Sequence, residues 1–381
     1  MIQRPLKTKG AYGTPALVGR VLPLEGRPIY CKTQSETASD RLKPGLRTLR
    51  RWLSYERCAL EPRNWIAMLA MALVCRGLCA GAANAAVMVP RIVGDGWTIA
   101  GDPDLGAYTN PKQEPVDFGI WQAADGSWQL WSCIRGTACG GNTRLFHRWE
   151  GRRLTDTNWT PRGIAMEAKP EFGETPGGLQ APFVFREGKQ FLMFYGDWEH
   201  ICAASSDDGK TFTRRAGADG KSGMFGEGPG SNTRDPMVLF TQGQWHCYYT
   251  AHPQRRGADY CRTSKDTRTW SDPRVVARGG ASGTNAYSAE CPFVLELTPG
   301  EYYLFRTQRY GRDAISRVYH SRDPLDFGLD KDAEHLVGSV PVAAPEIFQH
   351  DGQWYVASLL PSLKGIRLAK LEWVQDSETS R

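Results

Sequence analysis

Three acidic residues stand at the same point of a repeated sequence pattern, just before runs of apolar, strand-forming residues. Asp117 precedes "FGIW", Asp235 precedes "PMVLF" and Glu290 precedes "CPFVL". A single aspartate at the start of a strand is often only a turn residue. Several carboxylates directed into one shared space repel each other, and that cost needs a reason. A carboxylic acid with a raised pKa beside an ionised carboxylate is the pair that cleaves glycosidic bonds, so we predict that these three residues are catalytic.

The pattern that carries the acids occurs five times. Each copy has an apolar strand, a turn with glycine and a second strand rich in aromatic residues, and the copies begin at residues 117, 181, 235, 291 and 344. The last four starts are 54, 56 and 53 residues apart, and a weaker pair of strands follows each hairpin. Four strands per unit at this period are typical of a β-propeller blade. The predicted fold is therefore all-β, a five-bladed β-propeller with four-stranded antiparallel blades.

Two further expectations belong to this fold. Residues 93–100 are predicted to supply the outer strand of the last blade. A pair of stacked sandwiches is the alternative architecture, but it would not explain the near-constant period.

In a propeller the starts of the innermost strands and the loops after the second strands meet at one mouth of the central channel. The loops that follow the second strands are rich in Arg, His, Trp and Glu, whereas the hairpin turns on the opposite face contain fewer of these residues. This asymmetry indicates a binding face. We expect substrate contacts from Arg234, which precedes Asp235, and from these loop residues: Trp198, Glu199, His200, His252, Arg306, Gln308 and Arg309.

Two short motifs of the chain resemble a known family. "RDP" (234–236) and "ECP" (290–292) resemble signature motifs of glycoside hydrolase family 32, and "VDFGIW" takes the place of that family's first-blade Asp motif. The wider five-bladed clan, which includes family 43, is similar in carrying Asp, Asp and Glu in the same blade order. The resemblance spans about residues 93–373.

The resemblance implies a role for each acid. Asp117 would be the nucleophile or general base, Asp235 would orient the substrate and stabilise the transition state, and Glu290 would be the general acid. Arg234 would bind sugar hydroxyls. The chain departs from the family pattern, because "DFG" replaces Asp-Pro-Asn-Gly in the first blade and no His opens the fifth. It is therefore interpreted as a divergent relative whose substrate is not inherited from either family.

The predicted function is that of a secreted glycoside hydrolase acting on terminal, furanose-type sugars of oligo- or polysaccharides, with a carbohydrate as partner and neither a cofactor nor a metal site. A glycoside phosphorylase, with phosphate at "AHPQRRG" (251–257), and a non-catalytic carbohydrate-binding propeller are the alternatives. Carboxylates about 5–5.5 Å apart predict retention, and about 6.5–9.5 Å inversion. The family 32 resemblance favours the first and the family 43 resemblance the second.

The N-terminal region differs from the rest in charge and pattern. Residues 1–86 hold 14 of the 47 basic and 5 of the 41 acidic residues, so the remainder carries a net charge of −3 and a nucleic-acid partner is not expected. The apolar run at 65–75 has basic residues before it and small residues after it, which indicates a secretory signal at 64–86. An uncleaved membrane anchor is the alternative, but the run is too short to span a bilayer comfortably.

These features give the predicted organisation of the chain. Residues 1–63 are an upstream extension, either disordered or outside the translated protein, and 87–381 are the propeller. The protein would be secreted or periplasmic, with no lasting membrane insertion. Cys133 and Cys139 lie in one loop and could form a disulfide, while unlinked thiols in all six cysteines of the propeller are the alternative.

Overall fold

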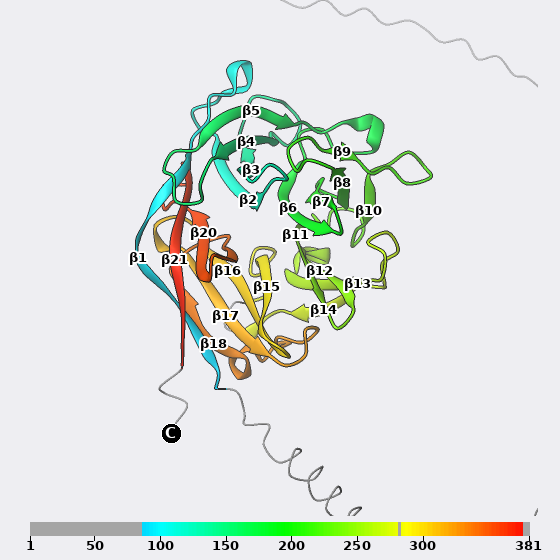
Figure 1. The fold of residues 1–381 in the computed structure, drawn as a ribbon. Coiled ribbons are helices and arrows are strands. Elements are labelled where there is room, and N and C mark those ends of the chain that lie inside the picture. The colour runs from blue at the N-terminus through cyan, green and yellow to red at the C-terminus, as the bar shows by residue number, and fades with distance from the viewer. Residues whose placement is uncertain (1–85, 281–282, 376–381) are drawn as a thin grey trace, which may run out of the picture. The chain divides into compact units, whose positions relative to one another are not determined.

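The computed structural model of the chain describes residues 86–280 and 283–375. The predictions for the upstream extension and the secretory signal, up to residue 85, lie outside these residues. Within the described part, five antiparallel sheets surround one axis as the blades of a propeller (Figure 1). The predicted all-β, five-bladed fold is therefore confirmed. None of the helices in the described part is long and apolar enough to cross a membrane.

Each blade runs from an innermost strand at the axis to an outer strand at the rim. Blade 1 contains β2 (Glu114–Gln122), β3 (Trp128–Arg135), β4 (Leu145–Gly151) and β5 (Thr160–Met166). Blade 2 contains β6 (Gln180–Glu187), β7 (Gln190–Gly196), β8 (Ile201–Ser206) and β10 (Gly223–Phe225), with the short β9 (Thr213–Arg214) also paired to β8. Blade 3 contains β11 (Arg234–Thr241), β12 (Gln244–Ala251), β13 (Ala258–Ser264) and β14 (Arg274–Ala277).

The last two blades follow the same plan. Blade 4 contains β15 (Glu290–Thr298), β16 (Glu301–Arg309), β17 (Ile315–Ser321) and β18 (Leu336–Val340). Blade 5 contains β19 (Glu346–His350), β20 (Gln353–Leu359), β21 (Gly365–Gln375) and β1 (Met88–Gly101). Short 3-10 helices lie in the connections: η1 (Gly106–Tyr108), η2 (Pro170–Phe172), η3 (Pro253–Arg255), η5 (Gly311–Asp313) and η6 (Asp332–Glu334).

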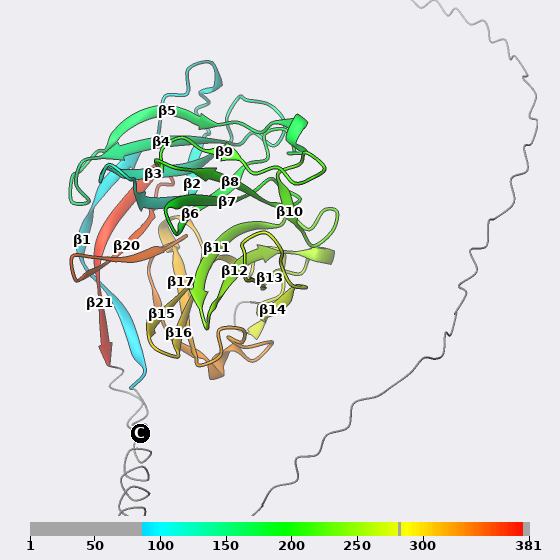
Figure 2. The same ribbon diagram turned by 45° about the vertical axis from the view of Figure 1, so that its right-hand side comes forward.

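The ring is closed by strands from the two ends of the described region. β1 pairs antiparallel with β21 from Met88 opposite Gln375 to Gly101 opposite Gly365. The two long strands lie side by side in Figures 1 and 2. The prediction that residues 93–100 form the outer strand of the last blade is confirmed, and the strand is longer than expected. Hydrogen bonds between β1 and β21 thus join the first and last parts of the propeller.

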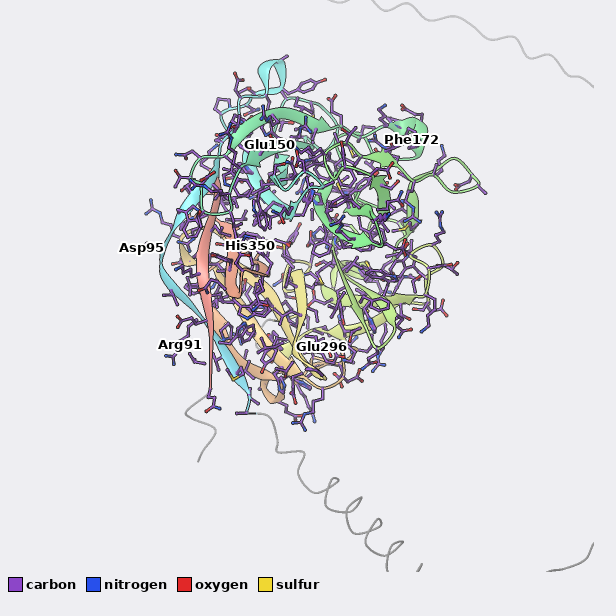
Figure 3. The ribbon with its side chains drawn as sticks, viewed as in Figure 1. Arg91, Asp95, Glu150, Phe172, Glu296 and His350 are labelled. Atoms are coloured by element: carbon purple, nitrogen blue, oxygen red, sulfur yellow. The ribbon has the colours of Figure 1, made fainter. Side chains whose placement is uncertain are left out.

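Side chains fill the space between neighbouring sheets (Figure 3). The Trp128 ring of blade 1 packs edge-on against His350 of blade 5, with ring centroids 5.1 Å apart. Thr241 of blade 3 donates a hydrogen bond to Glu296 of blade 4 at 2.8 Å. Large aromatic side chains lie fully buried among the sheets, which explains the aromatic second strands of the repeat: Trp131, Tyr195, Tyr248, Tyr249, Tyr302 and Tyr303.

One backbone feature recurs at the start of every innermost strand. A residue other than glycine has a positive φ there, and it is followed by Phe in blade 1 and Pro in the others: Asp117 (φ 32), Ala181 (φ 44), Asp235 (φ 56), Cys291 (φ 49) and Ala344 (φ 48). In blades 1 to 4 the strand register shifts at this point, as in a β-bulge. A bulge redirects the side chain it carries. A left-handed non-glycine residue costs about 1–3 kcal/mol, so the fold maintains this geometry against strain in all five blades.

The cysteines of the described region are all free thiols. Cys133 is buried and its sulfur contacts the Leu179 carbonyl of blade 2 at 3.3 Å. The Cys139 sulfur faces the Arg144 carbonyl at 3.7 Å. The two side chains serve different contacts, so the predicted Cys133–Cys139 disulfide is not formed and the alternative of unlinked thiols holds.

Candidate active site

The five left-handed residues line a single narrow cavity on the propeller axis. Asp117, Asp235 and Cys291 share it with Ala181 and Ala344, together with the residues that follow each of them in its strand. The free volume open to a water-sized sphere is about 20 Å³, which is enough for about one water molecule. A ligand the size of a ring would therefore have to lie above this cavity, at the mouth.

Arg234 joins two of the three predicted catalytic acids. Its Nη2 donates a hydrogen bond to Glu290 Oε1 at 2.6 Å, and its Nε lies 3.5 Å from Asp235 Oδ2. The Arg234 and Asp235 side chains are 5% and 4% exposed, and that of Glu290 is 14% exposed. Arg234 Nη1 also donates to the Asn232 carbonyl at 2.9 Å. Contacts with Glu290, Asp235 and the Asn232 carbonyl thus hold the guanidinium in place, and its positive charge offsets the negative charges of the two carboxylates.

Asp117 approaches the same point from blade 1. The Cys291 thiol donates to Asp117 Oδ1 at 3.3 Å, and its sulfur lies 3.2 Å from the Tyr310 hydroxyl. Burial raises the pKa of Asp117 to about 6, the Asp235 charge adds to this rise, and the Arg144 charge opposes it. Asp117 is therefore protonated more readily than a solvent-exposed aspartate.

Glu290 reaches the site from one residue earlier than the bulge, since Cys291 holds the left-handed position in blade 4. Burial raises the pKa of Glu290, while the Arg234 guanidinium favours the carboxylate and opposes that rise. The main-chain N–H of Cys291 donates to Asp235 Oδ2 at 3.2 Å. Blades 3 and 4 therefore hold their two acids in one hydrogen-bonded unit with Arg234.

The predicted substrate residues of blade 2 lie in the loop after β7. Trp198 has a left-handed backbone (φ 87), and the Arg144 guanidinium stacks over its ring at 5.0 Å. Glu199 Oε2 accepts a hydrogen bond from the Gly230 N–H at 3.1 Å. His200 is half-exposed, and its hydrogen bond to Asp197 raises the pKa of its imidazole. Of these three, Trp198 is connected with the acids, because Arg144 acts on the pKa of Asp117.

His252 joins the centre through Arg234. Its Nδ1 lies 3.4 Å from Arg234 Nη1, and burial together with the Arg234 charge lowers the pKa of His252. The imidazole meets the Tyr287 ring edge-on, with centroids 5.9 Å apart. Tyr287 itself is 64% exposed. On this side of the mouth, His252 is therefore the inner, polar residue and Tyr287 the outer, aromatic one.

Of the three predicted residues at the end of β16, Arg306 is too buried to contact a substrate. Arg306 is fully buried, its Nη2 donates to the Gly279 carbonyl at 3.2 Å, and its Nε lies 3.9 Å from the buried Asp259. Gln308 donates to the Ser288 carbonyl at 3.2 Å, and Arg309 is exposed at the strand end. The alternation of the strand turns Arg306 into the space between sheets and away from the mouth.

Four residues of the site were not among the sequence-based candidates: Cys291, Tyr310, Arg144 and Tyr287. The repeat register already marked Cys291, which stands where the other blades have Asp or Ala. Tyr310 lies in a loop that was expected at the mouth (307–312), and Arg144 lies just after another (133–141). Tyr287 had no periodic signal, since the loop before β15 is unique to blade 4.

The fold is that of the five-bladed propeller glycoside hydrolases of families 43 and 32. An endo-arabinase from Bacteroides thetaiotaomicron VPI-5482 superposes with a TM-score of 0.55 at 14% identity, over 74% of this chain and 99% of its own. A thermostable family-43 glycoside hydrolase gives a TM-score of 0.51 at 17% identity, over 71% of this chain and 94% of its own.

A family-32 β-fructofuranosidase from Bombyx mori, solved in complex with sucrose, has a TM-score of 0.52 at 17% identity. The match covers 73% of this chain and 62% of that one. Neither a protein-family profile nor the sequence of a curated protein matches the chain. At these identities the similarity establishes the fold, and the chemistry has to be argued from the residues above.

Proposed function

We propose that this protein is a glycoside hydrolase whose catalytic residues are Asp117, Asp235 and Glu290. The observation that carries the proposal is the Arg234 guanidinium, buried between Asp235 and Glu290 at 3.5 and 2.6 Å beside a third acid from blade 1. Three carboxyl groups at one mouth are costly to hold together. Glycosidic bond cleavage uses such groups, because it needs a proton donor and an ionised carboxylate at the same sugar.

Burial raises the pKa of both Glu290 and Asp117, so we assign their roles by blade and not by these shifts. Burial raises the pKa of Glu290, which favours the protonated form that a general acid needs. Asp117, across the axis, is the nucleophile or the general base, and it acts in its ionised form. Asp235 is held by the Cys291 N–H and by Arg234, so it is the acid best placed to orient the sugar. Arg234 and His252 supply donors for its hydroxyls.

The proposed substrate is a terminal sugar of small ring size, such as a furanoside, on an oligo- or polysaccharide. The axial cavity is narrow, so the reacting sugar binds across the mouth with its linkage facing the acids. The structural neighbours named above include a β-fructofuranosidase, whose name agrees with a furanoside, and an endo-arabinase, whose name does not favour a terminal sugar.

A panel of aryl furanosides and plant or algal oligosaccharides tests the proposal. We expect release of the aryl group or of a terminal sugar without added phosphate, and loss of that release in Glu290→Gln. The anomer formed first, followed by NMR, then distinguishes retention from inversion. Turnover only with phosphate would assign a phosphorylase, and binding across the panel with no turnover would assign a carbohydrate-binding propeller.

We also propose that the protein is exported, on the evidence of the apolar run at 65–75 and the Ala83-Asn84-Ala85 sequence after it. Expression of the full chain in a bacterial host, followed by N-terminal sequencing of the periplasmic or external fraction, is the test. A new N-terminus at residue 86 or 87 supports export. An uncleaved chain in the membrane fraction would show an anchor instead.

A further inference from the structure

Three of the five left-handed positions carry side chains that can bind a metal ion. Asp117, Asp235 and Cys291 each direct one donor atom to the axis, and these atoms lie within 4.8 Å of one another. The Cys291 sulfur and Asp117 Oδ1 are 3.3 Å apart. For zinc with bonds of about 2.3 Å to sulfur and about 2.0–2.2 Å to oxygen, a tetrahedral site requires donors roughly 3.5 Å apart. The remaining distances need to shorten by about 1 Å, which side-chain rotation can supply.

An independent observation points to a ligand at this place. Asp235 is 95% buried, yet its Oδ1 has no hydrogen-bond partner among the described residues, while its Oδ2 accepts from the Cys291 N–H. Asp235 lines the axial cavity. A buried carboxylate oxygen without a donor is costly, and an ion or water in the cavity would satisfy it.

The kind of ion follows from the donor set. Two carboxylates and one thiolate at the apex of a narrow cavity, with the mouth side open, match a three-ligand zinc site with an open position. The sulfur selects thiophilic ions over Ca²⁺ and Mg²⁺, which prefer oxygen ligands. We infer that Asp117, Asp235 and Cys291 form a binding site for a thiophilic divalent cation, Zn²⁺ or Cd²⁺, and that an ion bound there occupies two of the proposed catalytic carboxylates.

Binding is a simple exchange. The Cys291 thiol releases its proton to solvent, and its sulfur and two carboxylate oxygens donate electron pairs to the ion. The Tyr310 hydroxyl, 3.2 Å from the sulfur, can hydrogen-bond to the thiolate. The ion replaces the hydrogen bond from the thiol to Asp117 and compensates the repulsion between the carboxylates. We expect the bound ion to inhibit turnover, and this expectation rests on the function proposed above. The binding of the ion does not rest on that function.

The test uses the full chain without its other thiols, except the four that are buried in the propeller. Cys31, Cys58, Cys75, Cys79 and Cys139 are changed to serine as a background, since Cys133, Cys202, Cys247 and Cys261 are buried. Cd²⁺ is titrated into this background, and the sulfur-to-cadmium charge-transfer band is measured in the ultraviolet. We expect one equivalent of Cd²⁺ to produce the band. Adding Cys291→Ser should remove it and weaken Cd²⁺ binding by more than about 100-fold, because even changes outside the ligand sphere cost about 10–100-fold.

Two further measurements make the result specific. Asp117→Ala should weaken Cd²⁺ binding while leaving Cys291 in place, and a melting curve with and without Zn²⁺ should show stabilisation in the background variant only. A band that persists in the background with Cys291→Ser, or a chain that Zn²⁺ does not stabilise, would overturn the inference. If Cd²⁺ binds but no glycoside is cleaved, the metal site stands and the proposed function fails. If Cd²⁺ produces no band and glycosides are cleaved equally well in its presence, the metal site fails and the function stands.

Discussion

Blades 1, 3 and 4 differ from blades 2 and 5 at one backbone position that all five share. The left-handed residue is Asp117, Asp235 or Cys291 in the first group and Ala181 or Ala344 in the second. All five line the same cavity. The alanines adopt the strained conformation without bringing any group that could do chemistry.

This difference separates architecture from function. Because alanine gains nothing from a positive φ, the bulge must serve the packing of five strands around the axis. The proposed chemistry then depends only on which side chain each bulge carries. Blade 4 shows how little is needed, since it places Glu290 one residue before the bulge and still reaches the same Arg234.

The largest effect is expected from the acids themselves. Asp117→Asn, Asp235→Asn and Glu290→Gln each remove an ionisable group with almost no change in shape. We expect kcat/KM on a cleaved aryl furanoside to fall by about 10²–10⁴-fold in each variant, the usual contribution of general acid–base catalysis.

The matched control is Ala344→Ser, at the same backbone position of blade 5, where the left-handed residue is not an acid. It should keep most of the activity, with a far-UV circular dichroism spectrum like that of the wild type in all four variants. Wild-type turnover in any acid variant would remove that acid from the catalytic set. Equal loss in Ala344→Ser would show that the position, and not the acid, matters.

The repeat made the fold and the register of the acids predictable from the sequence. The near-constant spacing gave five blades, and the residue before each Pro or Phe placed Asp117 and Asp235 on the axis. The bulge itself could not be predicted, because an alternating strand pattern shows which face a side chain occupies but not where the register shifts. The same register marks Cys291 in blade 4, but the search for carboxylates favoured its neighbour Glu290.

Contacts between distant segments explain the remaining differences between the predicted and the observed side-chain positions. Arg306 was expected at the mouth, but whether it points there or toward Asp259 depends on how blade 4 packs against blade 3. Trp198 stacks under Arg144, which comes from another blade. Neither partner can be found from local sequence, since each pair is brought together only by the packing of neighbouring sheets.

A smaller effect is expected from replacing Arg234 or Arg214. Arg234 lies in blade 3, which has an acid at the left-handed position, and Arg214 lies in blade 2, which has alanine there. Arg234→Gln leaves Asp235 and Glu290 without their counter-ion. Arg214→Gln in blade 2 does the same to Glu174, which Arg214 holds by two hydrogen bonds of 2.7 and 2.8 Å. Each variant should lose about 3–5 kcal/mol in free energy of unfolding, measured with urea, because each leaves a buried carboxylate without its counter-ion.

Only Arg234→Gln should also lose turnover when the protein is assayed well below its melting temperature. Arg214→Gln should keep the wild-type kcat/KM. If both variants retained activity, Arg234 would be a structural residue only. If both lost it, the loss would reflect the fold and not the site.

The spacing between the two kinds of blade is set by a glycine. A Cβ at Gly119 of blade 1 would lie 2.4 Å from the Pro182 carbonyl oxygen of blade 2. Gly119→Ala should therefore cost about 1–3 kcal/mol, the usual range for overpacking. Gly101→Ala, where no atom lies within 4 Å, should change stability by less than about 0.5 kcal/mol. Equal melting temperatures for the two variants would show that the blades can shift to accommodate the methyl group.

The smallest effect concerns a carboxyl group in blade 5 that the proposed mechanism does not use. Glu346 lines the axial cavity two residues after Ala344, and burial raises its pKa well above the ordinary value of 4.5. At a pH below 4.5 it is protonated in both the folded and the unfolded chain. As the pH rises, the unfolded chain ionises first, so the folded state loses stability until the raised pKa is reached.

Glu346→Gln should therefore have the same urea midpoint as the wild type at pH 4 and a higher one at pH 7, by about 1 kcal/mol or more in free energy of unfolding. The matched change Glu296→Gln, on the hairpin side of blade 4, removes an acceptor that binds Thr241 and should be destabilising at pH 7. A wild type that is as stable as Glu346→Gln at pH 7 would mean that the cavity solvates the carboxylate. Blade 5 would then have an ionised carboxylate at the axis, as the acid-bearing blades do. It would differ from them in where the carboxylate stands in the strand and no longer in charge.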